Sequence, residues 1–174
     1  MVTRKSMKLP IVITFIFICI IVYLFMNIKQ YVVVCEKTTS YDADIKLVET
    51  VTSNLDGKKI TALNVVKKVT VPSKHAKQQE ALIGIRNSLD YTIEYLGDKA
   101  SCVIVDNHVI ANIDVSNDEL VLLDNISFVD NNGEIGVTID TNTKSSNNIA
   151  LRVGDSYTDG ELKMYLKNHG YSCK

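Results

Sequence analysis

A chain of 174 residues with 19 Lys or Arg and 20 Asp or Glu has room for one ordinary domain besides a short terminal segment. The four charged residues among the first thirty positions are all basic, so the remainder carries a net charge of −5. This mild acidity excludes nucleic acid as an expected partner, because phosphate backbones call for clustered Lys and Arg.

Leu9–Met26 is an uncharged, strongly apolar run near the start of the chain. In a helix that rises about 1.5 Å per residue it would cover roughly 27 Å, close to the hydrocarbon thickness of a bilayer. We therefore expect a transmembrane anchor over residues 9–28. The membrane is then the first predicted partner, through Leu9–Met26.

Basic residues on either side of the apolar run set its predicted orientation. Three of them precede the run and only Lys29 follows it closely, and basic residues stay on the cytoplasmic side. Residues 1–8 are then a cytoplasmic tail, and residues 31–174 form the extracytoplasmic domain of a single-pass cell-membrane protein. A cleaved signal peptide and an unusual lipoprotein are the alternatives, although the small residues that such cleavage needs do not follow the run.

Alternation of apolar and polar residues predicts strands at the start of the outer domain. Tyr31–Cys35 is a short β-branched run, and apolar residues of one parity recur in Ile45–Leu55 and again in Lys58–Val71. Asp56–Gly57 stands between the last two runs, and Asp-Gly between such runs is a strong hairpin signal.

A long helix is predicted over residues 74–96. Ser73 can cap its start and Gly97 can close its end. An apolar stripe with a period of 3.6 residues should pack against one side of the sheet. The stripe consists of Leu82, Ile85, Leu89, Ile93 and Leu96.

Two strand-like runs follow, at 101–105 and 108–115, and a polar stretch of uncertain structure fills about 116–153. Thr158 and Glu161 have capping-box spacing, which predicts a short helix that ends near Asn168. The expected fold class is α+β: one N-terminal transmembrane helix, then an antiparallel sheet with a long helix and a short C-terminal helix, in the order β-β-α-β-β-α.

Three cysteines lie in the predicted outer domain, so at most one disulfide forms within it. Cys35 begins the domain and Cys173 is the penultimate residue of the chain, so a bond between them would close a loop of nearly the whole domain. Cys102 lies within a strand-like run, where a buried thiol is an ordinary core residue. We predict a Cys35–Cys173 disulfide; Cys35–Cys102 pairing and a fully reduced domain are the alternatives.

Several groups of polar residues resemble functional sites only weakly. Asp130, Asn132 and Glu134 alternate oxygen ligands, but they lack the glycine position and the final Glu of a calcium loop. Ser73 and His75 are neighbours without an acid placed to orient the imidazole. Acid pairs such as Glu94 with Asp98, or Asp114 with Asp118, are common in an acidic domain. The sequence therefore predicts no catalytic, cofactor-binding or metal-ligating residue, and no cofactor.

Four short stretches carry a resemblance to a known group. They are V-C-E-K-T after the apolar run, Asp56-Gly-Lys-Lys-Ile60, the Val71–Pro72 step into the long helix, and the terminal L-K-N-H-G-Y-S-C-K. With them the chain resembles the YehR-like small envelope lipoproteins of Gram-positive bacteria, over most of residues 31–174. The resemblance implies an envelope location and an α+β fold, and it supplies no activity.

The predicted function rests on the predicted location of the domain, because the sequence contains no catalytic or ligand-binding motif. A compact domain held outside the cell membrane, without a catalytic constellation in its sequence, indicates a non-enzymatic module that binds an envelope protein, a peptide or an envelope polymer. The alternatives are an envelope hydrolase that uses a carboxylate pair or a metal, and a structural or assembly subunit of a membrane complex.

Overall fold

The computed structural model describes residues 16–18, 30–41, 45–75, 77–123, 126–131, 134–139 and 149–174. The chain divides into two compact units, Met1–Gln30 and Tyr31–Lys174. Of the first unit the structure describes mainly Ile16–Ile18, which are helical. The rest of the predicted anchor lies outside the described residues.

The expected fold class is corrected in its first element. Among the described residues, no helix is both long and apolar enough to cross a membrane. The longest of them, α2 (Gln78–Ile93), has 16 residues, and its exposed face carries charged side chains such as Arg86 and Asp90.

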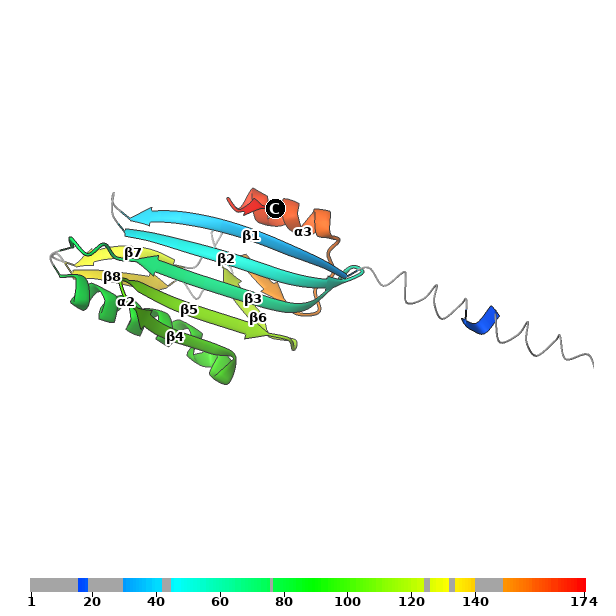
Figure 1. The fold of residues 1–174 in the computed structure, drawn as a ribbon, viewed down its shortest axis with the longest axis horizontal. Coiled ribbons are helices and arrows are strands. Elements are labelled where there is room, and N and C mark those ends of the chain that lie inside the picture. Colours follow the sequence, from blue (N-terminus) through cyan, green and yellow to red (C-terminus); the bar gives the residue numbers. More distant parts are fainter. Residues whose placement is uncertain are drawn as a thin grey trace, which may run out of the picture. The chain divides into compact units, whose positions relative to one another are not determined.

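Six strands make the main sheet of the second unit, in the order β10-β1-β2-β3-β5-β4 (Figure 1). The pairs β10 with β1, β2 with β3, β3 with β5, and β5 with β4 are antiparallel. The strands are β1 (Gln30–Tyr41), β2 (Ile45–Asp56), β3 (Lys59–Thr70), β4 (Ala100–Val105), β5 (His108–Val115) and β10 (Ser172–Cys173).

The described part of the unit also contains two further strand pairs and three helices. The pairs are β6 (Leu120–Leu123) with β9 (Ile149–Arg152), and β7 (Ile126–Asn131) with β8 (Glu134–Ile139). Besides α2, the helices are η1 (Glu94–Lys99) and α3 (Asp159–Asn168). The observed order of strands and helices therefore replaces the expected β-β-α-β-β-α order.

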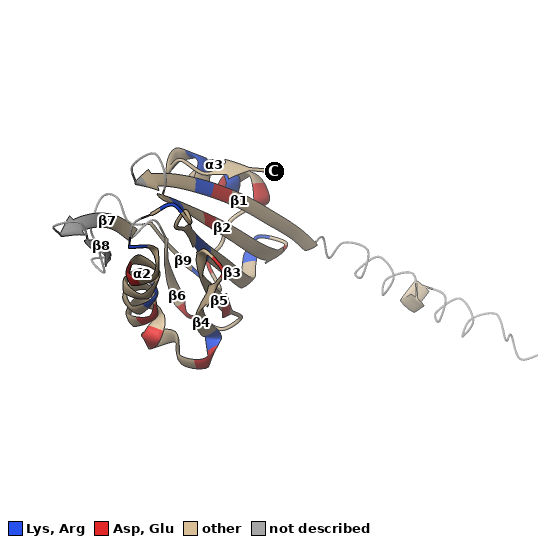
Figure 2. Ribbon diagram, turned by 60° about the vertical axis from the view of Figure 1, so that its left-hand side comes forward, with Lys and Arg blue, Asp and Glu red and all other residues tan. Residues whose placement is uncertain are grey.

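One face of the sheet is buried and the other meets solvent. Alternate residues of β2, β3 and β5 point into a single core that also contains side chains of α2, β6, β9 and α3. In Figures 1 and 2, α2 runs along the β4 side of the sheet while α3 lies beside β1. The predicted helix stripe is buried throughout: Leu82, Ile85, Leu89, Ile93 and Leu96 are at most 5% exposed.

Within the described residues, the turns of the β2–β3 and β4–β5 hairpins both use a positive φ. In the β2–β3 hairpin, Asp56 pairs with Lys59, so the turn residues are Gly57 and Lys58, one position later than the sequence predicted. Gly57 has φ of 61°, as the first central position of a type II′ turn requires. Asp106, with φ of 54°, opens the corresponding turn between β4 and β5.

The long helix starts and ends differently from the prediction. It begins after Lys77, which makes no side-chain capping bond, rather than after Ser73. Gly97, expected to close the helix, instead lies at a kink inside η1, with φ of 59°, and η1 continues to Lys99. The short helix α3 has the predicted capping box: the Thr158 side chain accepts from the Glu161 amide, and the Glu161 side chain accepts from the Thr158 amide.

Candidate functional site

Cys35 and Cys173, the pair expected from the sequence, form a disulfide. They are direct register partners on β1 and β10, and their Cα atoms lie 4.0 Å apart across 138 residues of sequence. The Lys174 amide adds a hydrogen bond to the Val34 carbonyl oxygen at 3.1 Å. Cys102 is a free, buried thiol on β4.

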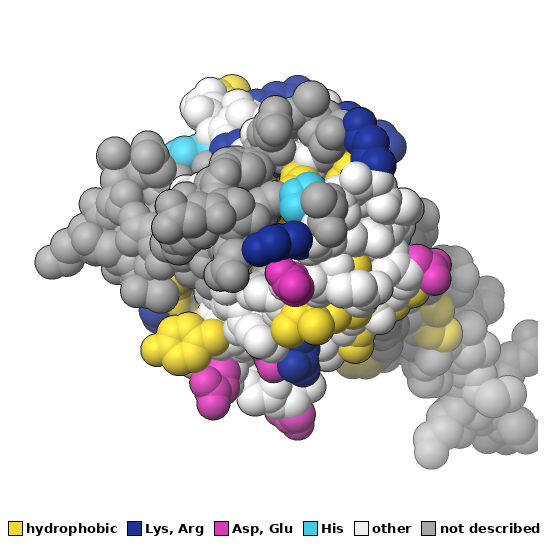
Figure 3. Space-filling view, turned by 90° about the vertical axis from the view of Figure 1, so that its left-hand side faces the viewer, with side chains coloured by type: hydrophobic (Ala, Val, Ile, Leu, Met, Phe, Trp, Pro, Cys, Tyr) yellow, Lys and Arg dark blue, Asp and Glu magenta, His cyan; other side chains and the backbone are white. Residues whose placement is uncertain are grey.

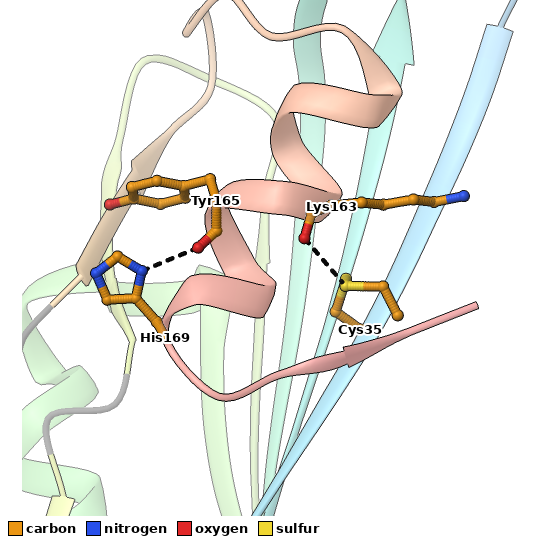
Figure 4. The surroundings of a disulfide bond; sticks show 5 residues. Cys35, Lys163, Tyr165 and His169 are labelled. Atoms are coloured by element: carbon orange, nitrogen blue, oxygen red, sulfur yellow. Dashed lines mark hydrogen bonds between the residues drawn. A yellow bond between two sulfur atoms is a disulfide. The ribbon is translucent and has the colours of Figure 1, made fainter.

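Helix α3 lies over this disulfide (Figure 4). The Cys173 sulfur is 3.8 Å from the Lys163 carbonyl oxygen. At the end of the helix the ring centroids of Tyr165 and His169 lie 4.9 Å apart, and His169 Nδ1 lies 2.9 Å from the Tyr165 carbonyl oxygen. The C-terminal segment is therefore fixed both by the covalent bond and by contacts of the helix that precedes it.

A buried polar cluster lies beneath the same segment. Glu49 and Lys67 are register partners on β2 and β3, 3% and 2% exposed, with Lys67 Nζ 2.8 Å from Glu49 Oε2. Lys67 also donates to the Leu122 carbonyl oxygen of β6 at 3.3 Å. The Tyr171 hydroxyl donates a hydrogen bond to Glu49 Oε1. The cluster therefore joins the centre of the sheet to β6 and to the C-terminal segment.

The arrangement of this cluster favours a structural role. Its charged groups lie within the core and line neither of the two pockets described below. The attraction between two buried charges offsets the free-energy cost of removing them from water only when they are paired and hydrogen-bonded, as these are. We therefore place the candidate binding site elsewhere on the domain.

A pocket of about 650 Å³ with both polar and apolar lining opens where three parts of the chain meet: the start of β3, the β5–β6 connection and the β9–α3 connection. We call it the loop pocket. Its lining is Lys59, Ile60, Thr61, Ser116, Asn117, Asp118, Arg152, Val153, Gly154 and Asp155.

Backbone hydrogen bonds hold the walls of the loop pocket together. The Ile60 amide donates to the Asp155 carbonyl oxygen at 2.9 Å, and the Gly154 amide donates to the Ile60 carbonyl oxygen at 2.8 Å. Gly154 has φ of 107°, a backbone conformation that side chains with a Cβ rarely adopt. A glycine is therefore required where the β9–α3 connection meets the start of β3.

Charges of both signs line the loop pocket. Arg152 Nε lies 3.8 Å from Asp118 Oδ1, and both side chains are substantially exposed, at 49% and 80%. The Asp155 carboxylate accepts a hydrogen bond from the Arg152 amide at 2.9 Å. Lys59 is exposed at the start of β3, and its Cε atom and Asp118 Oδ1 both lie within 4 Å of the place that a Cβ would take at Gly154. The pocket therefore offers exposed cations and carboxylates side by side.

A second, smaller pocket of about 470 Å³ lies between the end of α2 and the start of β4. Its lining includes Asn87, Asp90, Tyr91, Glu94 and Ala100. Tyr91 is 78% exposed. This pocket flanks the free edge of the main sheet.

The residues of the weak sequence constellations lie in several different parts of the domain. His75 Nδ1 accepts a hydrogen bond from the Lys77 amide at 3.3 Å, as part of the turn before α2. Asp118 lines the loop pocket, whereas Glu94 lines the smaller pocket. Asp130 and Glu134 belong to β7 and β8, and Asn132 lies outside the described residues.

Sequence reasoning missed the residues that matter most for the loop pocket. Arg152 lies at the end of the stretch of uncertain structure, Gly154 and Asp155 directly follow that stretch, and the sequence predicts only a strand at Lys59. Their one local signal is Gly154–Asp155 directly after a short apolar run, which marks a turn. The other residues that line the pocket, at the start of β3 and in the β5–β6 connection, are roughly 30 to 90 residues away from them in sequence. No local sequence pattern links segments that are so far apart.

Comparison of the chain with protein-family models, with curated proteins and with solved structures finds no match. The resemblance to the YehR-like envelope lipoproteins therefore stays a prediction.

Proposed function

We propose that this chain is an exported binding module that holds a segment of a charged peptide or envelope polymer in the loop pocket. The observation that carries the proposal is the pairing of Arg152 with Asp118 in an open pocket that also contains Lys59 and Asp155. A non-enzymatic role needs only these donors and acceptors.

The disulfide supports a location outside the cytoplasm. Cys35 and Cys173 close the domain covalently, and such bonds persist in oxidising compartments and are rare where thiols are kept reduced. The apolar run that follows Arg4, Lys5 and Lys8 also supports export of the domain out of the cytoplasm. The proposed location is therefore the extracytoplasmic side of the cell envelope.

The shape and charge of the pocket narrow the ligand class. Small-molecule sites enclose most of their ligand, whereas the Arg152 and Asp118 side chains are 49% and 80% exposed to water. An extended chain that crosses the pocket suits this openness better than an enclosed metabolite. Cations and carboxylates side by side suit a ligand with both anionic and cationic groups, such as a peptide or a zwitterionic polymer.

Binding of the full chain to isolated envelope fragments of the producing cells tests the proposal. Arg152→Ala and Lys59→Ala should each weaken retention, and rising salt should weaken retention of the unaltered chain, since exposed charges are screened. Lys77→Ala removes an exposed lysine on the α2 side and is the matched control. Equal retention of all four proteins would remove the loop pocket as the binding site.

A further inference from the structure

The two outer strands of the main sheet differ sharply in how they are protected. At one edge β10 covers β1 at Cys35 and Glu36, and the Lys174 amide bonds to Val34. At the other edge β4 is the last strand of the described sheet, and its sequence ASCVIV has no charged residue and no proline. Natural sheets usually blunt a free edge with such residues, because an unprotected edge pairs with another strand.

Aliphatic side chains are also exposed along β4. Val103, Ile104 and Val105 are 49%, 39% and 45% exposed. In Figure 3 the lower part of the described surface, at the height of α2 and β4 in Figure 1, mixes hydrophobic side chains with acidic and basic ones. Among the described residues, the edge therefore offers backbone groups that no further strand pairs with, together with apolar side chains.

The hairpin fixes which backbone groups of β4 face outward. Val105 pairs with His108 across the two-residue turn Asp106–Asn107, so these two flanking residues exchange hydrogen bonds. By alternation Val103 also bonds to β5. The amide and carbonyl groups of Cys102 and Ile104 then point away from the sheet.

Helix α2 adds charges beside this edge. The Cys102 sulfur donates weakly to the Arg86 carbonyl oxygen at 3.7 Å, and Asp90 shares the smaller pocket with Ala100 of β4. Arg86 and Asp90 form an exposed ion pair at 3.2 Å on one face of the helix. A second helix that runs antiparallel past α2 would bring each Arg86 toward the other helix's Asp90.

We propose that β4 pairs antiparallel with β4 of a second copy of this chain, so that the two main sheets become continuous across a two-fold axis. An antiparallel strand edge is complementary to itself under such an axis, and the Arg86–Asp90 pair is also complementary to itself. The register places Val103 opposite Val103 of the second copy, and Cys102 beside Ile104 of the second copy. Val103 and Ile104 then each gain an apolar cross-strand neighbour, whereas Val105 lies opposite Ser101 of the second copy.

Cysteine crosslinking of the full chain tests both the contact and its register. Val103→Cys, made together with Cys102→Ser, should give a disulfide-linked dimer on a non-reducing gel. In the proposed register the two copies of residue 103 form a non-hydrogen-bonded cross-strand pair, in which the Cα atoms lie only about 4.5 Å apart. Ile110→Cys in the same background is the control. Ile110 is the register partner of Val103 on β5, on the same face but one strand inward.

Sedimentation of the full chain in detergent supplies an independent readout. The unaltered chain should have twice the monomer mass, and Ile104→Lys should halve it while the Cys35–Cys173 disulfide still forms. A monomeric unaltered chain would overturn the proposal, as would equal crosslinking at positions 103 and 110. Crosslinking of Val103→Cys to a different protein would also overturn it, in favour of strand addition by that partner.

Discussion

The Tyr171 hydroxyl donates a hydrogen bond to Glu49, a residue 122 positions earlier in the chain, inside the core. Tyr171 lies two residues before Cys173, and Glu49 is paired with Lys67 at the centre of the sheet. The same C-terminal segment therefore both closes the disulfide and contributes to the hydrogen bonding of a buried charge pair.

Tyr171→Phe should lower the free energy of unfolding by about 1.5 to 3 kcal/mol, the range for a hydrogen bond to a charged group. The phenylalanine ring fills the same space as the tyrosine ring, so the loss of stability measures the contribution of the hydroxyl group. Urea unfolding of the oxidised chain measures it. Tyr91→Phe is the control, because Tyr91 is 78% exposed and should change stability little. Equal effects of the two substitutions would contradict a role for the buried bond.

Leu89→Ala should cost about 2 to 5 kcal/mol of unfolding free energy, since Leu89 is 0% exposed at the centre of the α2 stripe. Ile83, on the same helix, is 51% exposed, and Ile83→Ala serves as the comparison. The measurement is the same urea titration. A cost below about 1 kcal/mol at Leu89 would mean that the stripe does not pack into the core.

The Cys102 thiol should react slowly with alkylating reagents in the folded protein. Burial, and then the nearby Asp90 carboxylate, raise its pKa to about 11, so only about one thiol in a thousand is ionised at pH 8. Labelling should accelerate as the pH rises toward 11, and in urea it should approach the rate of a free cysteine. Mass spectrometry of labelled peptides follows it. Fast labelling of the native chain at pH 8 would contradict this environment.

Glu161 should link stability to pH through the capping box. Hydrogen bonds from the Thr158 amide, then from the Thr158 hydroxyl, lower the pKa of Glu161 below its usual 4.5. A carboxylate whose folded pKa is depressed stabilises the protein above its unfolded pKa, and this contribution is lost as pH falls through the folded pKa. Glu161→Gln should therefore be less stable than the unaltered chain at pH 7, and the difference should shrink below pH 4.5. Thermal unfolding across this range measures it, and a difference that grows on acidification would reverse the sign.

Local sequence patterns were sufficient to predict the elements whose signal lies within one short segment of the chain. The stripe from Leu82 to Leu96 and the Thr158–Glu161 box are both as expected, and the ends of the domain suggested the cysteine pair. The β2–β3 hairpin was also found, although a bulge at Asn54 and Leu55 accompanies a turn that is displaced by one residue.

Elements that depend on distant partners were missed. β1 continues through the polar residues Lys37 to Ser40, which look like a loop but belong to a strand near the sheet edge. β6 pairs with β9 across the intervening β7 and β8, and that pairing positions Arg152 near Asp118 in the loop pocket. Contacts of this kind come from tertiary pairing, which overrides local propensity.

A charge swap in the loop pocket tests the central claim most directly. Asp118→Arg combined with Arg152→Asp keeps the same two groups in the pocket but exchanges their positions, while Lys77→Glu with Glu80→Lys exchanges an exposed pair on α2. Binding of each full chain to isolated envelope fragments is compared at one salt concentration, with unfolding as the check on folding. The account predicts that the loop-pocket swap abolishes retention and the α2 swap leaves it unchanged. Equal retention of both swapped chains and the unaltered chain would contradict it.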